Sequence, residues 1–236
     1  YLTCILATGS VITLIILQPD LSTTAMILII SFVMLFLGGA RLQHMMATAG
    51  VSFTFLSIVI MNWDYMRRRI DSFINPDTVN PDSLLQIKQS MISLANGGFF
   101  GLGLGNSYGK NHFLPTPHTD FIFAIVGEET GLIGTIFILT LFMFIFQRGI
   151  HIAKESPDIF GVMLALGISC SFILYAFINV AVVTNLVPTT GLAMPLVSYG
   201  GSGVVVHLAS LGILLNISQS KRSVQTDSDW RKRIYG

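Results

Sequence analysis

Long apolar stretches separated by short polar breaks dominate this chain. They occupy residues 1–17, 21–37, 45–61, 119–146, 159–183 and 204–217. Several of them approach or exceed the ~20 residues that a helix needs to cross a bilayer. The pattern therefore predicts an all-α, polytopic integral membrane protein with about six transmembrane helices.

The composition agrees with a membrane protein. Hydrophobic residues make up 52% of the chain and charged residues 11%, whereas roughly a quarter is charged in soluble domains. The net charge of +1 comes without a basic stripe, which argues against a nucleic-acid partner. Cys4 and Cys170 lie inside apolar runs and show no metal-ligand spacing. Because the chain starts within an apolar run and shows no signal-peptide pattern, we expect it to be the C-terminal part of a longer protein.

The lysines and arginines in the breaks predict the orientation. Arg41, Arg148, Lys154 and the cations near the C-terminus would share one side, which the positive-inside rule makes cytoplasmic. We therefore expect a membrane domain at 1–218 and a cytoplasmic basic tail at 219–236. The long segment at about 62–118 would be an extracytoplasmic loop, on the same side as the break at 18–20 and the connection at 185–203.

The long segment has two recognisable parts. Apolar residues between 84 and 94 follow helical spacing, which predicts an amphipathic helix at the membrane surface. A glycine-rich stretch follows at 97–109, but its spacing fits neither a P-loop nor a dinucleotide fingerprint. We interpret it as a re-entrant turn whose backbone is covered by protein or water.

Two aspartates lie at predicted outer helix ends. Asp20 follows Pro19 and either caps the helix at 21–37 or serves the site, and the two roles are compatible. Asp120 follows Pro115 and Pro117 at the outer start of the helix at 119–146. The prolines would hold it stiffly at the membrane–water boundary.

Glu128 and Glu129 interrupt the apolar part of the same predicted helix. On a continuous helix they would lie about 12–13 Å deeper than Asp120, where a charge is costly and needs a partner. His207 is the best candidate on the sixth helix. The separation is too large for the two carboxyls of a glycosidase pair. We therefore expect Asp120 to serve chemistry, and Glu128, Glu129 and His207 to serve structure or coupling.

Five sequence blocks resemble one known family. They are "LQPDLSTT", "RRRIDSFINP", "QIKQSMISLANGGFFGLGLGNSYGK", "FLPTPHTDFIFAIVGEETGLIG" and "LVPTTGLAMPLVSYGGSG". In this order they resemble the SEDS proteins (shape, elongation, division and sporulation), and "GLGNSYGK" is most similar to the division-type FtsW and sporulation-type SpoVE members. The resemblance implies a fold of roughly ten helices, of which the C-terminal six are present here.

The resemblance also implies an activity. It implies an inverting glycosyltransferase that polymerises lipid II at the outer face of the bacterial cytoplasmic membrane for division or sporulation septa, with the residue at Asp120 as the essential acid. A class B penicillin-binding protein (a transpeptidase) and other divisome or sporulation membrane proteins are the implied partners. No nucleotide is needed outside the cell, because lipid II carries its own diphosphate.

Other polar residues of the outer side would bind the substrate. Cations are needed for the leaving diphosphate, and a divalent ion such as Mg²⁺ or Mn²⁺ is the alternative to protein side chains. The expected substrate-binding residues are Arg67, Arg68, Lys110, His118, Thr119 and Asp20.

Two other classes of function remain open from the residues alone. One is a flippase for lipid-linked cell-wall precursors, in which Glu128 and Glu129 would relay protons. The other is a non-catalytic scaffold that recruits a transpeptidase.

Overall fold

The computed structural model describes residues 1–75, 81–107 and 120–235, with side chains described except at 65, 81–84 and 220–235. These residues form helices joined by turns and loops, without a strand. The helices are α1 (Leu2–Ile16), α2 (Leu21–Leu37), α3 (Leu42–Asn62), α4 (Asp64–Ile74), α5 (Pro81–Gly97), α7 (Ile122–Glu155), α8 (Ile159–Val183) and α9 (Gly201–Tyr235). The predicted all-α class is confirmed.

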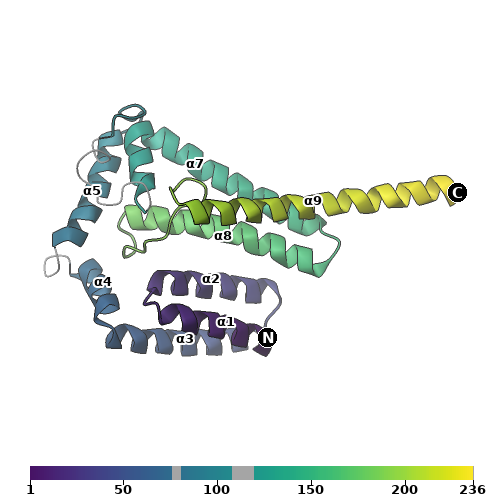
Figure 1. The fold of residues 1–236 in the computed structure, drawn as a ribbon, viewed down its shortest axis with the longest axis horizontal. Helices are drawn as coiled ribbons and strands as arrows, with labels where there is room; N and C mark the ends of the chain where they lie inside the picture. The colour runs from purple at the N-terminus through teal and green to yellow at the C-terminus, as the bar shows by residue number, and fades with distance from the viewer. Residues whose placement is uncertain (76–80, 108–119, 236) are drawn as a thin grey trace.

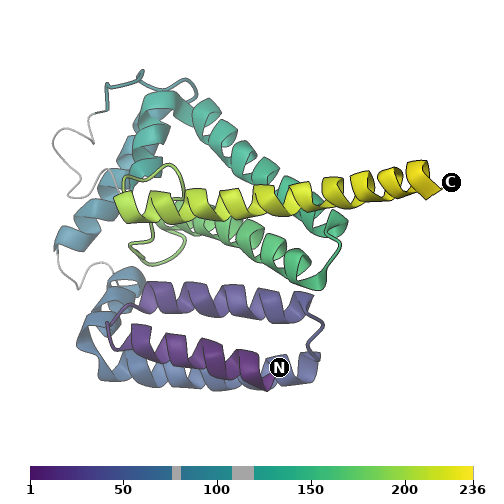
Figure 2. The ribbon, with the colours of Figure 1, turned by 45° about the vertical axis from the view of Figure 1, so that its right-hand side comes forward.

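The helices form two groups that meet through α2 and α8 (Figures 1 and 2). α1, α2 and α3 lie side by side with successive helices antiparallel, and α7, α8 and α9 form the second group. The main hydrophobic core lies between α7 and α8, where Phe123, Phe142 and Phe172 are almost fully buried. Ala165 and Ala176 are fully buried on α8, and such small side chains allow neighbouring helices to approach closely.

Four described helices are long and apolar enough to cross a membrane: α3, α7, α8 and the 201–219 part of α9. α1 and α2 are apolar but shorter, with 15 and 17 residues. The predicted bounds 21–37 and 159–183 are confirmed, because α2 and α8 have these limits. Large apolar side chains such as Phe53 (75% exposed) face outward, as expected for surfaces in contact with lipid.

The connections gather at two ends of the bundle. The α1–α2 turn, α4, α5 and the connection between α8 and α9 lie at one end (left in Figures 1 and 2). The N-terminus, the α2–α3 and α7–α8 turns and the C-terminal end of α9 lie toward the other. This grouping is the one that the sequence predicted, and the first end is called the loop end below.

Two elements differ from the sequence prediction. Residues 64–74 form an additional helix, α4, at the loop end. α9 continues to Tyr235, so the basic tail extends the sixth helix without a break. Regular helical hydrogen bonding continues past the apolar part because the polar tail has no proline or glycine before residue 236.

The predicted fourth helix is interrupted at Gly131. This residue has φ 67° and ψ −166°, which is not a helical conformation. The part before the break, residues 122–130, runs across the loop end next to α5, and the long part after it runs along the bundle (Figure 1). The expectation that Glu128 and Glu129 lie about 12–13 Å deeper than Asp120 assumed that this stretch runs along the bundle, whereas residues 122–130 run across its loop end.

Candidate functional site

A cluster of glycines fixes the half-helix at 122–130 to α5 and to the turn that follows α5. We call Gly97, Gly101, Gly127 and Gly131 the glycine clasp. A Cβ at Gly97 would lie 2.8 Å from the carbonyl carbon of Gly127, and a Cβ at Gly131 would lie 2.5 Å from the amide nitrogen of Gly101. Any larger residue at Gly97, Gly101 or Gly131 would overlap main-chain atoms, so only glycine permits this approach there. A Cβ at Gly127 would instead meet the Leu94 side chain.

Main-chain hydrogen bonds join the two segments of the clasp. The glycine-rich turn donates to the end of the half-helix, and the start of the long helix donates back to the turn. The four bonds are Leu102 N–H to Glu128 O (2.9 Å), Gly103 N–H to Glu129 O (3.0 Å), Leu132 N–H to Gly98 O (2.9 Å) and Ile133 N–H to Phe99 O (3.3 Å). The turn therefore satisfies the main-chain groups that the break at Gly131 releases. This is the protein cover that the predicted re-entrant turn required.

Glu128 belongs to this junction. Its side chain is fully buried and accepts a hydrogen bond of 2.5 Å from the Ser107 hydroxyl. Glu129 is partly buried in the same half-helix. His207 instead packs edge-on against the rings of Phe172 and Tyr175, with centroid distances of 5.4 and 6.2 Å. No contact between either glutamate and His207 occurs in the described part of the chain, so the expected packing of these residues is not found.

Asp120 lies at the loop end, directly before the half-helix. α7 begins at Ile122, and its first main-chain bonds go to the Phe121 carbonyl. The side chain of Asp120 therefore does not cap the helix. Its main-chain carbonyl accepts a 3.0 Å hydrogen bond from the side-chain amide of Asn179 on α8. Asp120 as a whole is partly exposed.

Among the described residues, Arg69 brings a positive charge close to Asp120. A Cβ placed on Gly191 would lie 3.6 Å from Oδ2 of Asp120 and 3.8 Å from Nη2 of Arg69, so both charged groups face the same point of the α8–α9 connection. Nη1 of Arg69 also donates to the hydroxyl of Ser22 at the start of α2, at 3.3 Å. These contacts bring α2, α4, α7 and the α8–α9 connection together at one place.

The two arginines expected to bind substrate point elsewhere. Arg67 and Arg68 are exposed, and Arg67 forms a 3.8 Å ion pair with Asp71 one turn away. Met66, three residues before Arg69, is 1% exposed, and residues at this spacing share a helix face. The helical pattern of residues 64–74 could therefore have selected Arg69 from the three consecutive arginines.

Asp20 caps α2, which is one of the two roles expected from the sequence. Its carboxylate accepts from the Thr23 main-chain N–H at 3.0 Å and from the Thr23 hydroxyl at 2.6 Å. Such a cap stabilises a helix by about 1 kcal/mol. Ser22, the next residue but one, is 7% exposed and holds Arg69. The capped start of α2 thus positions Arg69 beside Asp120.

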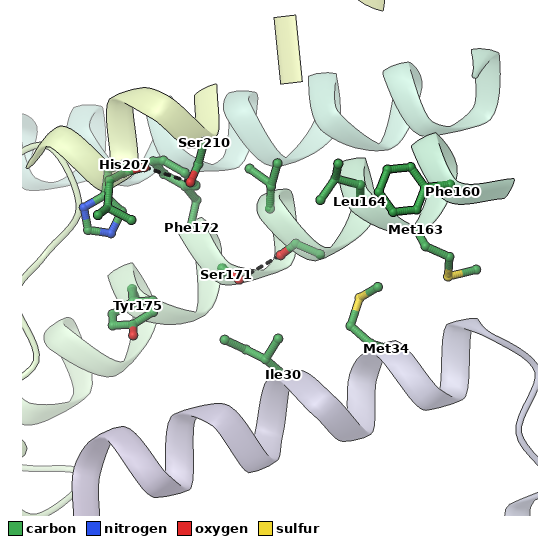
Figure 3. A pocket seen from close by; sticks show the side chains of 13 residues that line it. Ile30, Met34, Phe160, Met163, Leu164, Ser171, Phe172, Tyr175, His207 and Ser210 are labelled. Atoms are coloured by element: carbon green, nitrogen blue, oxygen red, sulfur yellow. Dashed lines mark hydrogen bonds between the residues drawn. The ribbon is translucent and has the colours of Figure 1, made fainter. Parts of the chain in front are cut away.

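An open apolar groove of about 550 Å³ lies between α2, α8 and α9 (Figure 3). Tyr175 and His207 lie near one end of it, while Met34, Met163 and Phe160 lie toward the other. Because α8 ends and α9 begins at the loop end, the end with Tyr175 and His207 is the one closer to Asp120. The groove therefore extends along the bundle from the region of the charged site.

Three of the expected substrate-binding residues belong to a segment that the structure does not describe. Lys110, His118 and Thr119 lie outside the described residues. Within the described ranges no three histidine, cysteine, aspartate or glutamate side chains are grouped as metal ligands, and the neighbour of Asp120 is a guanidinium. These donors do not fit a divalent-ion site, and we derive no step through a metal.

Comparisons with known proteins give the family. Residues 1–223 match the FtsW/RodA/SpoVE family model, described as cell cycle protein. A probable peptidoglycan glycosyltransferase FtsW from Geobacter sp. (strain M18) is 40% identical over 214 residues, covering 91% of this chain and 58% of that protein. Stage V sporulation protein E from Bacillus subtilis (strain 168) is 41% identical over 205 residues, covering 87% and 56%. The chain thus spans a little over half the length of these relatives.

Solved structures share the fold. A chain of a peptidoglycan synthase complex, described for its coordination of polymerization and crosslinking, superposes with a TM-score of 0.74 at 24% identity, covering 94% of this chain and 62% of that one. A mutant of the rod shape determining protein RodA from Thermus thermophilus gives a TM-score of 0.64 at 24% identity, covering 94% and 57%. On its sequence and its fold, this chain belongs to the FtsW/RodA/SpoVE family of cell cycle proteins.

Proposed function

We propose that the protein to which this chain belongs is a peptidoglycan polymerase, an inverting glycosyltransferase that joins lipid II disaccharide units into glycan strands. The observation that carries the proposal is the placement of Asp120 and Arg69 around one point at the loop end. A carboxylate and a guanidinium facing the same space supply the two charges that the reaction needs. The names of the relatives, probable peptidoglycan glycosyltransferases, support this substrate class.

Asp120 acts as the general base in this proposal. The 4-hydroxyl of the acceptor sugar attacks the anomeric carbon of the donor from the face opposite the diphosphate, and its proton passes to the Asp120 carboxylate. The bond between the anomeric carbon and the diphosphate oxygen breaks in the same step, which inverts the configuration. A positioned base of this kind contributes about 10²–10⁴ in rate.

Arg69 binds the diphosphate that leaves. Its guanidinium can form two parallel hydrogen bonds to phosphate oxygens, a geometry that a lysine lacks. The bond from Nη1 to Ser22 fixes the orientation of the side chain before substrate arrives. Prealigned positive charge at a departing anion stabilises the transition state.

The apolar groove accommodates the lipid of the substrate. Its lining between α2, α8 and α9 is mostly apolar, and its polar side chains include Tyr175 and His207 at the end near the site. A polyprenyl chain in the groove would keep its diphosphate at the loop end. The sugars then reach the aqueous side while the lipid stays among the helices.

The cellular role follows from the relatives. Similarity to FtsW and to stage V sporulation protein E supports synthesis of division or sporulation septa. We propose a class B penicillin-binding protein as the transpeptidase partner, with other divisome or sporulation membrane proteins. The protein would be a multi-pass protein of the bacterial cytoplasmic membrane with its loop end outside and its C-terminus in the cytoplasm.

Reconstitution of the full-length protein with its transpeptidase partner and labelled lipid II tests the function. We expect glycan polymer that depends on the full-length protein and forms without added nucleotide. Transfer of lipid II across the bilayer without polymer would support a flippase. Partner binding with neither activity would support a scaffold.

The variant Arg69→Gln tests whether the arginine close to Asp120 has a role that its exposed neighbours lack. Because Gln cannot carry the charge that offsets the leaving diphosphate, we expect polymerisation to fall about 10²-fold or more. Arg68→Gln is the matched control and should retain activity within about twofold, since Arg68 is exposed on the same helix. Equal losses in the two variants would contradict a specific role for Arg69.

The orientation is tested by cysteine labelling in intact cells. With Cys4 and Cys170 replaced, a cysteine at Asn75 should react with an impermeant thiol reagent because it lies at the loop end. A cysteine at Ser228 should react only after lysis. The reverse pattern would place the loop end in the cytoplasm and remove the proposed outward-facing site.

A further inference from the structure

The side chain of Asn179 connects three segments of the candidate site. Its amide nitrogen donates to the Asp120 carbonyl at 3.0 Å and to the Leu192 carbonyl at 3.0 Å. Asn179 itself is on α8 and is 1% exposed. One buried amide therefore links α8, the residue before the half-helix, and the α8–α9 connection.

These two bonds determine how the amide is oriented. A carbonyl can only accept, so both must face the –NH₂ group, which has two hydrogens. The assignment of nitrogen and oxygen on this side chain thus follows from its partners. The amide oxygen is buried and has no hydrogen-bond donor within the described residues.

The Asp120 carbonyl needs this donor. The first helical hydrogen bonds of α7 go to the Phe121 carbonyl, from Ala124 at 3.0 Å and Ile125 at 3.4 Å. The carbonyl of Asp120 lies outside this ladder, and Asn179 supplies its hydrogen bond. Without Asn179, the carbonyl of the proposed base would lose its hydrogen bond to α8.

The second bond places the α8–α9 connection over the carboxylate. Leu192 follows Gly191, whose φ is 73°. A Cβ placed on Gly191 would lie next to Oδ2 of Asp120 and Nη2 of Arg69. Holding the Leu192 carbonyl therefore fixes the distance between this connection and the charged pair. Both bonds act on the main chain, so Asn179 does not need to contact substrate.

From this geometry we infer that Asn179 is a positioning residue for glycosyl transfer, holding the main chain of Asp120 and of the Gly191–Leu192 turn in register. The inference rests on the proposed function for its catalytic consequence. Misplacement of a reacting group by about 1 Å lowers a rate by about 10²-fold. Loss of Asn179 should accordingly lower kcat and leave substrate binding nearly intact.

Asn179→Leu in the full-length protein with its partner tests the catalytic consequence, since Leu keeps the size but cannot donate. We expect kcat to fall 10- to 100-fold and KM for lipid II to change less than threefold. Ser90→Ala is the matched control. It removes a buried hydroxyl that donates to the Ile87 carbonyl at 2.8 Å and to the Val183 carbonyl of α8 at 3.2 Å. It should lower the thermal midpoint with little change in kcat.

A second measurement tests the positioning without any enzymatic activity. In a protein lacking Cys4 and Cys170, the pair Asp120→Cys and Gly191→Cys should form a disulfide under mild oxidation. Adding Asn179→Leu should slow its formation at least fivefold, and adding Ser90→Ala should not. Unchanged cross-linking in the Asn179→Leu background would overturn the inference even if the parent polymerises lipid II. Slowed cross-linking in a parent that makes no polymer would uphold the positioning and reject the proposed function.

If the parent protein polymerises lipid II, the kcat and KM of the variants test the inference further. A kcat loss of equal size in Asn179→Leu and Ser90→Ala would show a general stability effect and overturn the inference. A rise in KM with kcat unchanged would also overturn it, because it would assign Asn179 to binding.

Discussion

Asp120→Asn in the full-length protein with its partner should lose nearly all polymerisation of lipid II while folding and binding lipid II normally. Asparagine keeps the shape of the side chain, and the bond between Asn179 and the Asp120 carbonyl involves only the main chain. The amide cannot accept the proton of the attacking hydroxyl. We therefore expect a loss of about 10²–10⁴ in rate, measured as glycan formation from labelled lipid II.

Asp71→Asn is the matched control for Asp120. Asp71 lies on α4 at the same end of the bundle, has a half-exposed side chain, and pairs only loosely with Arg67 at 3.8 Å. Exposed ion pairs contribute between about 0 and 1 kcal/mol, so this variant should polymerise at nearly the parent rate. Near-normal polymer from Asp120→Asn would remove the residue from the mechanism.

The largest effect on stability is expected for Gly101→Ala. A Cβ there would lie 2.5 Å from the carbonyl carbon of Glu129 and 2.7 Å from the amide nitrogen of Gly131. The residue also has φ +78°, which costs a non-glycine residue about 1–3 kcal/mol. Because the clashing atoms are main chain, the turn must move off the half-helix, and overpacking adds about 1–3 kcal/mol.

The variant Gly105→Ala distinguishes the steric clash at Gly101 from the backbone strain of a positive φ. Gly105 has a similar φ of +85°, but a Cβ there would meet no atom within 4 Å. Thermal unfolding in detergent, followed by tryptophan fluorescence or by retention of monodisperse protein, should show a clearly lower midpoint for Gly101→Ala than for Gly105→Ala. Equal midpoints would mean that backbone strain alone accounts for the loss and that the clasp contributes nothing.

The hydrophobic pattern by itself determined the number and order of the apolar helices. It placed 21–37 and 159–183 with the limits that α2 and α8 have, because burial in lipid requires long uninterrupted apolar runs. It also predicted the amphipathic helix inside α5 and the grouping of loops at two ends. Asp120 could be selected from sequence through its position after two prolines and through the family resemblance.

Tertiary contacts determined the features that the hydrophobic pattern does not encode. The break at Gly131 is invisible to hydropathy, because the apolar run continues through it, and it exists only because the glycine-rich turn supplies hydrogen bonds to the released main chain. Glu128, which the sequence placed at membrane depth, is instead buried at this junction, where it accepts a hydrogen bond from Ser107. The meeting of Arg69 with Asp120, and the link through Asn179, depend on segments far apart in the sequence meeting in space. Periodicity describes one helix at a time, so the partners across helices were determined only by their packing.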